Sequence, residues 1–213
     1  MFDRSGNDYT SKTYWDSRFE TEETFEWVAD FKQFSALLTS ELKPTDKILQ
    51  IGCGNSKLCF ELANLGFTQL TNVDFSSVLI DKYAVKYPEM AWICDDMRSL
   101  EHIPDDSFDV VIEKATIESL LAKEKSVWTF SDSAQADLRS TLAAIRRVLK
   151  PGGIFISISF TPPYFRVNYL VEQEWDVDVS EFGDGFHFYC YKMRKGLKPD
   201  LDKLERFLRV NKN

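Results

Sequence analysis

The chain has 213 residues, of which 44% are hydrophobic and 28% are charged. This length suits one domain with a sizeable buried core, and the composition is ordinary for a globular protein. No apolar run approaches the roughly 18 residues that a membrane-spanning helix needs, and the N-terminal stretch lacks the apolar core of a signal peptide. We therefore expect no membrane segment and a cytosolic location.

The chain is acidic, with 26 Lys and Arg against 34 Asp and Glu and a formal net charge of −8. Acidic proteins bind nucleic acid poorly because affinity for it depends on neutralising phosphates. The charge suits a basic protein partner or a small ligand, or it only keeps the protein soluble. The sequence predicts no metal site, because no CxxC motif or Cys/His cluster joins Cys53, Cys59, Cys94 and Cys190.

Taken in chain order, the pattern predicts helical pieces over 12–42, followed by alternating strands and helices. Short apolar runs predict strands at 47–51, 69–73, 91–94, 108–112 and 154–159. Helices are expected at 56–65, 76–86 and 134–149, the first ending at Gly66 and the second capped by Ser76. The Lys-Pro-Gly-Gly run at 150–153 is expected to terminate the third helix.

Two β-branched and aromatic runs, 175–179 and 186–193, flank Gly183-Asp184-Gly185 and predict a hairpin. A charged helix over 200–210 closes the chain. Alternating βα units followed by a hairpin predict an α/β three-layer αβα sandwich, with a seven-stranded, mostly parallel sheet. We expect one domain over 1–213, divided into an N-terminal helical lid (1–45), a core (46–196) and a C-terminal helix (197–213).

Ligands of such sheets bind beyond the carboxyl ends of the strands, where polar residues follow three of the predicted strands. Gly52 and Gly54 follow the first strand, and glycines there let a ligand approach the backbone. Lys57 replaces the Gly or Ala of the dinucleotide fingerprint GxGxxG, which disfavours a pyrophosphate cradle. Asp74 can accept the ribose hydroxyls of a dinucleotide or of S-adenosylmethionine, and Asp96 can accept the adenine amino group.

The segments 48–56, 72–77, 95–100, 108–114 and 147–153 together resemble the class I S-adenosylmethionine-dependent methyltransferases. More closely, the chain resembles the eukaryotic translation elongation factor 1A lysine methyltransferases. That resemblance extends over residues 14–196 and rests on the segments 14–19, 25–27, 52–56, 113–116, 163–166 and 185–188. It implies a Rossmann-like fold, S-adenosylmethionine as cofactor, and a basic protein substrate, elongation factor 1A.

The resemblance also implies which residues contact the cofactor. They are Trp15, Phe19, Trp27, Gly52, Asp74, Phe75, Asp96, Met97 and Lys114, to which the glycine turn itself adds Gly54. Phe19 and Phe75 stand where the family often has Tyr, which keeps the packing and loses the phenol hydrogen bond. Met97 either flanks the adenine or fills the core.

The N-terminal aromatic residues favour a lid. Trp15 and Phe19 are four residues apart and share one helix face, which can pack on the methionine arm and near its sulfonium. Too many aromatic residues precede the first strand for a solvated tail, so we expect 12–31 to order over the cofactor. The alternative is that these side chains belong to the core.

Methyl transfer from a sulfonium is an in-line displacement, in which the protein's main task is alignment. The reaction needs no nucleophilic side chain or metal, but a lysine substrate must lose its proton, which desolvation or a proton path to water favours. Glu113 and Glu118 could orient the incoming ammonium or take its proton, and the sequence identifies no general base. His187 is either a structural histidine or part of the channel wall. The full set of substrate-channel candidates is Glu113, Glu118, Phe160, Tyr164 and His187.

Three alternatives stay open. A nicotinamide-dependent oxidoreductase fits the sheet, but Lys57 and the terminal hairpin disfavour it. A binder without activity is disfavoured by the retained glycines and acids at the strand ends. A methyltransferase of another protein or of a small molecule is compatible with the same site. We expect a monomer, and binding of S-adenosylmethionine rather than NAD would separate the enzyme classes.

Overall fold

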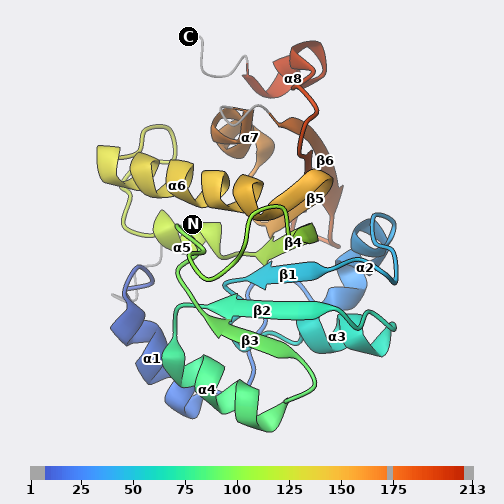
Figure 1. Ribbon diagram of the computed structural model, residues 1–213. Helices are drawn as coiled ribbons and strands as arrows, with labels where there is room; N and C mark the ends of the chain where they lie inside the picture. Colours follow the sequence, from blue (N-terminus) through green and yellow to red (C-terminus); the bar gives the residue numbers. More distant parts are fainter. Residues whose placement is uncertain (1–7, 172–174, 209–213) are drawn as a thin grey trace.

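The computed structural model describes residues 8–171 and 175–208, whose strands form one seven-stranded sheet in the order β3-β2-β1-β4-β5-β7-β6. Strands β1 to β5 run parallel to one another, and β7 runs antiparallel to both β5 and β6 (Figure 1). This confirms the predicted mostly parallel sheet with a terminal hairpin. The strands are β1 (Ile48–Ile51), β2 (Leu70–Asp74), β3 (Ala91–Cys94), β4 (Phe108–Lys114), β5 (Leu149–Ser159), β6 (Asp176–Phe182) and β7 (Phe188–Arg194).

Helices cover both faces of the sheet and produce the three layers. The described helices are α1 (Lys12–Thr21), α2 (Phe31–Thr39), α3 (Leu58–Asn64), α4 (Ser77–Lys86), α5 (Ile117–Leu120), α6 (Asp132–Val148), α7 (Pro163–Val171) and α8 (Leu201–Leu208). The buried side chains of α2 and α3 share one apolar cluster with Ile48 and Ile112. Those of α6 and α7 share another with Leu49 and Val111. Successive strand residues therefore point to opposite layers, as the pleat requires.

Several predicted boundaries are confirmed by local hydrogen bonds. The Ser76 hydroxyl accepts the Leu79 N–H at 3.4 Å, so Ser76 is the N-cap of α4. Gly66 has φ +92° just beyond α3, and the Phe67 N–H bonds back to the Leu62 carbonyl at 3.2 Å. Helix α6 begins two residues earlier than predicted, because Ser131 caps it through the Ala134 N–H.

The Lys-Pro-Gly-Gly run does follow the end of α6, but it lies inside β5 and not in a loop. Phe108 pairs with Leu149 and Val110 pairs with Ile154, so the register shifts across residues 150–153. Gly152 takes φ +76° within this irregularity. The predicted start of β5 at residue 154 was therefore too late.

The hairpin is confirmed, with somewhat different strand limits. Its turn lies at 183–187, and Gly183 has φ +104°, where an added Cβ would be 2.4 Å from the Phe186 carbonyl oxygen. Since Ser159 pairs with Tyr189, this turn projects beyond the end of β5. The turn therefore lies at the same edge of the sheet as the glycine turn after β1.

Helices α5 and α7 are the main elements that the sequence analysis missed. Pro163 opens α7, a position that proline suits because its φ is helical and its missing N–H is not needed there. Val167 and Leu170 bury α7 against the layer that contains α6. This helix places side chains behind the ends of β4 and β5.

The remaining differences are small. Cys53, Cys59 and Cys190 are buried, whereas Cys94 is exposed on the edge strand β3. Part of the predicted C-terminal helix, residues 209–213, lies outside the described residues. Helices long and apolar enough to cross a membrane are absent from the described chain.

Candidate functional site

The N-terminal segment, defined here as residues 8–30, is fastened to α4 at the carboxyl ends of the strands (Figure 1). The Ser76 hydroxyl donates to the Asp16 carboxylate at 2.5 Å, and the Tyr83 hydroxyl donates to the Glu23 carbonyl at 3.1 Å. The sequence analysis missed Asp16, which bonds the residue that caps α4. These bonds fix α1 beside the end of β2.

The three aromatic residues of the N-terminal segment that were predicted to contact the cofactor, Trp15, Phe19 and Trp27, lie together. Trp15 stacks on Phe19, with ring centroids 5.5 Å apart, and meets Trp27 edge-on at 5.7 Å. Phe19 is 2% exposed and lies 3.7 Å from the point where a Cβ on Gly54 would be. Trp27 is 38% exposed, with the Arg18 guanidinium over its ring. The group thus extends from the glycine turn to the surface.

The glycine turn after β1 requires both glycines. Gly52 and Gly54 have φ values of +53° and +51°, a region that L side chains rarely adopt. A Cβ on Gly52 would lie 2.0 Å from the methyl carbon of Thr116, whose hydroxyl donates to the Gly52 carbonyl at 3.1 Å. The sequence analysis included Thr116 in the segment 113–116 but gave it no role, whereas in the structure it packs the start of α5 against the turn.

Asp74, at the end of β2, is buried with two backbone donors. Its carboxylate oxygens accept the Gly54 N–H at 2.9 Å and the Ser76 N–H at 3.0 Å. Burial raises the pKa of Asp74 to about 6, against the effect of these N–H groups. A carboxylate offers about four lone-pair positions, so two remain for hydroxyl donors. The residues present therefore fit a ribose with two free hydroxyls.

Asp96, after β3, has a different environment. Two guanidinium nitrogens of Arg98 hold its carboxylate, one of them at 2.6 Å. Burial opposes ionisation, but Arg98 outweighs it and lowers the pKa of Asp96. Met97 is half-buried against the α6 layer, and Phe75 is half-buried after β2. All three follow neighbouring strands at the same edge of the sheet.

Lys114 ends β4 and is buried in an ion pair with the N-terminal segment. Its side chain is 3% exposed, and its Nζ lies 2.7 Å from Glu26 Oε2. Glu26 also accepts the Ser56 hydroxyl at 3.0 Å and the Lys57 N–H at 2.6 Å. The N-terminal segment therefore binds the loop after the glycine turn.

Glu22 strengthens the same attachment, since it accepts the Asn55 side-chain N–H at 2.9 Å. The sequence analysis named Lys114 as a cofactor contact but missed Glu22, and it gave no role to Glu26 of the segment 25–27. The sequence did indicate that Lys114 has an acidic partner, because a lysine at the end of a buried strand requires one. It did not reveal which acid supplies the charge.

Glu113 precedes Lys114 and points to the opposite layer, where it meets Arg166 of α7 at 2.7 Å. Both side chains have no exposed surface, and the Ser157 hydroxyl also donates to Glu113. Burial raises the pKa of Glu113, and the Arg166 guanidinium opposes that shift. Glu113 therefore lies within the core and does not reach the surface.

Glu118, on α5, meets the same guanidinium at 2.6 Å and is 11% exposed. The sequence analysis included Arg166 in the segment 163–166 but gave it no role, although a single arginine in an otherwise apolar stretch is a recognisable signal of a buried partner. Phe160, half-buried, follows β5 directly. The structure thus places Glu118 and Phe160 after the ends of neighbouring strands, β4 and β5.

His187 lies in the hairpin turn. The sequence analysis had placed it in a strand, so that prediction was wrong. Its side chain is 65% exposed and pairs with Glu181 on the hairpin itself. The turn projects from the correct edge of the sheet, beyond β5. The structure does not bring His187 into contact with the other predicted residues.

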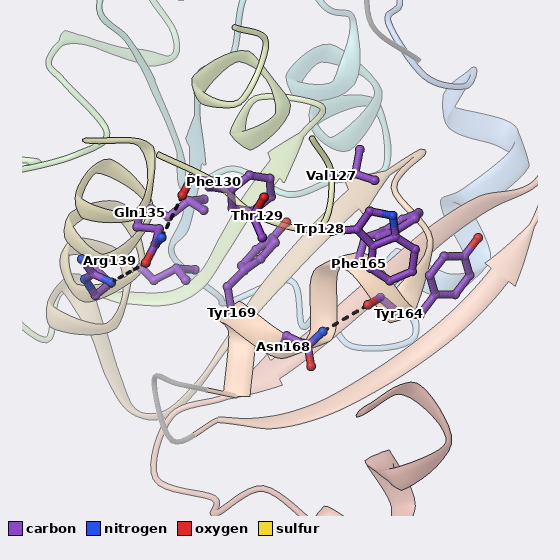
Figure 2. A pocket seen from close by; sticks show the side chains of 12 residues that line it. Val127, Trp128, Thr129, Phe130, Gln135, Arg139, Tyr164, Phe165, Asn168 and Tyr169 are labelled. Atoms are coloured by element: carbon purple, nitrogen blue, oxygen red, sulfur yellow. Dashed lines mark hydrogen bonds between the residues drawn. The ribbon is translucent and has the colours of Figure 1, made fainter. Parts of the chain in front are cut away.

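A hollow of about 260 Å³ lies between the loop before α6, α6 itself and α7 (Figure 2). Of the predicted site residues, Tyr164 lines it, stacked 6.5 Å from the exposed Trp128. None of the predicted cofactor residues does. The hollow is therefore separate from the strand ends that the N-terminal segment covers.

No metal site is evident in the described part of the chain, where no three His, Cys, Asp or Glu side chains gather suitably. The arrangement instead combines a buried carboxylate that fits a ribose, a close backbone turn and a cluster of aromatic side chains. Such groups can hold a nucleoside with an apolar, cationic arm.

Comparison with known proteins agrees with this geometry. A family model described as a methyltransferase domain matches residues 49–157. The mouse protein "EEF1A lysine methyltransferase 4" is 39% identical over 204 residues, covering 92% of this chain and 80% of the mouse protein. The human "eEF1A lysine and N-terminal methyltransferase" is 30% identical over 190 residues, covering 85% of this chain and 26% of the human protein.

Solved structures agree in fold. A Burkholderia thailandensis 1,6-didemethyltoxoflavin-N1-methyltransferase, with bound S-adenosylhomocysteine, superposes with a TM-score of 0.59 at 16% identity. The match covers 90% of this chain and 88% of that protein. The family model and the relatives show that the chain belongs to the class I S-adenosylmethionine-dependent methyltransferases, whose cofactor is S-adenosylmethionine, and the solved structure shares that fold.

Proposed function

We propose that this enzyme transfers methyl groups to the ε-amino group of a lysine in translation elongation factor 1A. The observation that carries the proposal is the 39% identity to a protein named for that activity, extending over 92% of this chain. A match of that extent includes β5, α7 and the hairpin as well as the cofactor turn. Solved structures below 25% identity support only the shared fold.

We propose that the cofactor is held by the strand ends and the N-terminal segment. Asp74 would accept the ribose hydroxyls, and the turn at Gly52 and Gly54 would admit the ligand close to the backbone. Asp96 and Met97 would border the adenine, with Phe75 beside them. Trp15, Phe19, Trp27 and Lys114 would cover the methionine arm, which makes the part of 1–45 that the structure describes a lid.

When bound, S-adenosylmethionine supplies a methyl group on a positively charged sulfur. The enzyme's residues must bring an uncharged amine in line with that methyl group, so that the C–N bond forms as the C–S bond breaks. The lysine must first release its ammonium proton to water, because only the neutral amine has a lone pair for the new bond. Phe160 and Tyr164 would desolvate the incoming lysine, which favours loss of its proton.

The remaining expectations about partners fit this substrate. The formal charge of −8 suits a basic protein and disfavours direct contact with nucleic acid. We further propose a monomeric enzyme that acts in the cytosol. One methyltransferase domain would comprise the N-terminal lid, the core and the C-terminal helix.

The test is methylation of purified elongation factor 1A made in bacteria, followed by peptide mass spectrometry. We expect one lysine to gain methyl groups with the wild-type enzyme and none with Asp74→Ala, which should not bind the cofactor. If the wild type binds S-adenosylmethionine yet leaves the factor unmodified, the substrate is wrong. Labelling a cell extract would then identify the true substrate.

A further inference from the structure

Arg166 of α7 is a fully buried guanidinium that joins two carboxylates from different elements. Its Nη2 donates to Glu113 Oε1 at 2.7 Å and to the Ser157 hydroxyl at 2.6 Å. Its Nη1 donates to Glu118 Oε1 at 2.6 Å and to the Ser159 hydroxyl at 3.2 Å. One side chain thus ties the ends of β4 and β5 to α5.

The two carboxylates differ in what they have left to bind. Both oxygens of Glu113 are occupied, since Oε2 accepts the backbone N–H groups of Thr116 at 2.8 Å and Ile117 at 3.3 Å. Glu118 uses only Oε1, which accepts Arg166 and the hydroxyls of Ser159 and Thr161. Its Oε2 is buried and has no hydrogen-bond partner among the described residues.

The charges of this cluster do not balance. Each donor N–H that points at Glu113 requires an acceptor, which favours its ionised form despite burial. Within the described residues, Arg166 is the one cation that contacts either carboxylate. One negative charge is left over, and the free acceptor is Glu118 Oε2. A monovalent cation with N–H donors would complement both the charge and the unused oxygen.

Glu118 also lies close to the turn at Gly52, which we assign to the cofactor. Thr116, two residues earlier, packs directly on the cofactor turn at Gly52. Glu113 fixes the start of α5 through two backbone bonds, so the helix cannot shift independently of Arg166. The free oxygen therefore belongs to an element fixed beside the turn at Gly52, beyond the carboxyl end of β4, which is the edge where ligands of such sheets bind.

We propose that Arg166 is a positioning residue that holds Glu118 so that its free Oε2 receives the ammonium group of the substrate lysine. This inference rests on the proposed function and deepens it. Glu118 would orient the lysine before it loses its proton, and Glu113 would anchor the arginine. Arg166 itself would not touch the substrate.

The first test is Glu118→Gln, assayed with elongation factor 1A at saturating S-adenosylmethionine. We expect kcat/KM to fall about tenfold or more, chiefly through KM, with the Kd for S-adenosylmethionine unchanged. Asp105→Asn is the matched control, since it removes an exposed carboxylate that pairs with Arg147. It should leave kcat/KM unchanged, which separates a local effect from loss of overall negative charge.

The second test asks whether Arg166 acts through Glu118. Arg166→Lys should lower kcat/KM about tenfold in the wild-type background and have no further effect in Glu118→Gln. If Arg166→Lys does not fold, Ser159→Ala replaces it, because Ser159 bonds both Arg166 and Glu118. Its smaller loss should likewise vanish in the Glu118→Gln background.

The outcomes separate the two proposals. If the wild type methylates the factor but Glu118→Gln keeps its kcat/KM, the role of Glu118 is refuted and the function stands. If the effects of the two substitutions simply add, Arg166 has only a structural role and the inference fails. If the wild type does not methylate the factor, the proposed function fails and this inference fails with it.

Discussion

The two halves of the sheet stabilise their buried carboxylates in different ways. In the cofactor half, β1 to β3 with α1 and α4, Asp74 is met by backbone N–H groups only two and 20 residues away. In the substrate half, β4 to β7 with α5 and α7, Glu113 is met by a guanidinium 53 residues away. Local backbone contacts therefore hold the Asp74 carboxylate without a distant side chain. The ion pair of Glu113 exists only when α7 is in place.

From this difference we expect cofactor binding and substrate specificity to depend on separate parts of the chain. The cofactor half can bind its ligand with groups fixed by the strand ends. The substrate half depends on α7 and α5 having docked. Substitutions should therefore separate cofactor affinity from substrate affinity, and four predictions test that separation.

Of the four changes, Asp74→Ala should weaken cofactor binding most. Two charge-assisted bonds to ribose hydroxyls, each worth about 1.5–3 kcal/mol, would be lost, which weakens cofactor binding by at least about 100-fold. Calorimetry measures this directly. Asp81→Ala, which removes an exposed acid from α4, is the control and should bind normally. Unchanged affinity in Asp74→Ala would remove Asp74 from the site.

Trp15→Ala tests the lid. If Trp15 covers the ligand, cofactor affinity should fall by about 1–3 kcal/mol while the melting temperature of the free protein hardly changes. As a core residue, Trp15 would instead lower that melting temperature by several degrees. Differential scanning calorimetry with and without cofactor separates these cases. A large loss of stability at unchanged affinity would reject the lid.

Acidification should weaken cofactor binding. Because the pKa of Asp74 is about 6 in the free protein, lowering the pH from 7 to 5 should reduce affinity about tenfold. The same shift has the opposite sign for folding: the folded protein holds this proton more tightly than the unfolded chain, so this group's contribution to stability falls as pH rises from about 4 to 6. Asp74→Asn should show neither dependence, and a flat binding profile in the wild type would contradict the assignment.

Trp128→Ala should have the smallest effect of the four. It complements Trp15→Ala, because it tests substrate binding and not cofactor binding. Trp128 is 56% exposed and lines the hollow beside α7, so we expect KM for the protein substrate to rise about threefold to tenfold. Cofactor affinity should stay the same. If cofactor affinity fell instead, the two halves would not act separately.

The same contrast explains how much could be predicted from sequence. Asp74, the two glycines and Ser76 act within a few residues of a strand end, so local patterns were sufficient to place them. Lys114 and Glu113 depend on Glu26 and Arg166, which are 88 and 53 residues away. Nothing in the local pattern specifies such partners, because register and helix packing decide them.

If the two halves carry separate tasks, cofactor affinity should depend on Asp74 and not on Glu118. Calorimetric titration of S-adenosylmethionine into three proteins measures this. The proteins are the wild type, Asp74→Ala and Glu118→Gln. Affinity should fall at least about 100-fold in Asp74→Ala and stay within about twofold of the wild type in Glu118→Gln. Equal losses in the two variants, or normal binding by Asp74→Ala, would contradict the division.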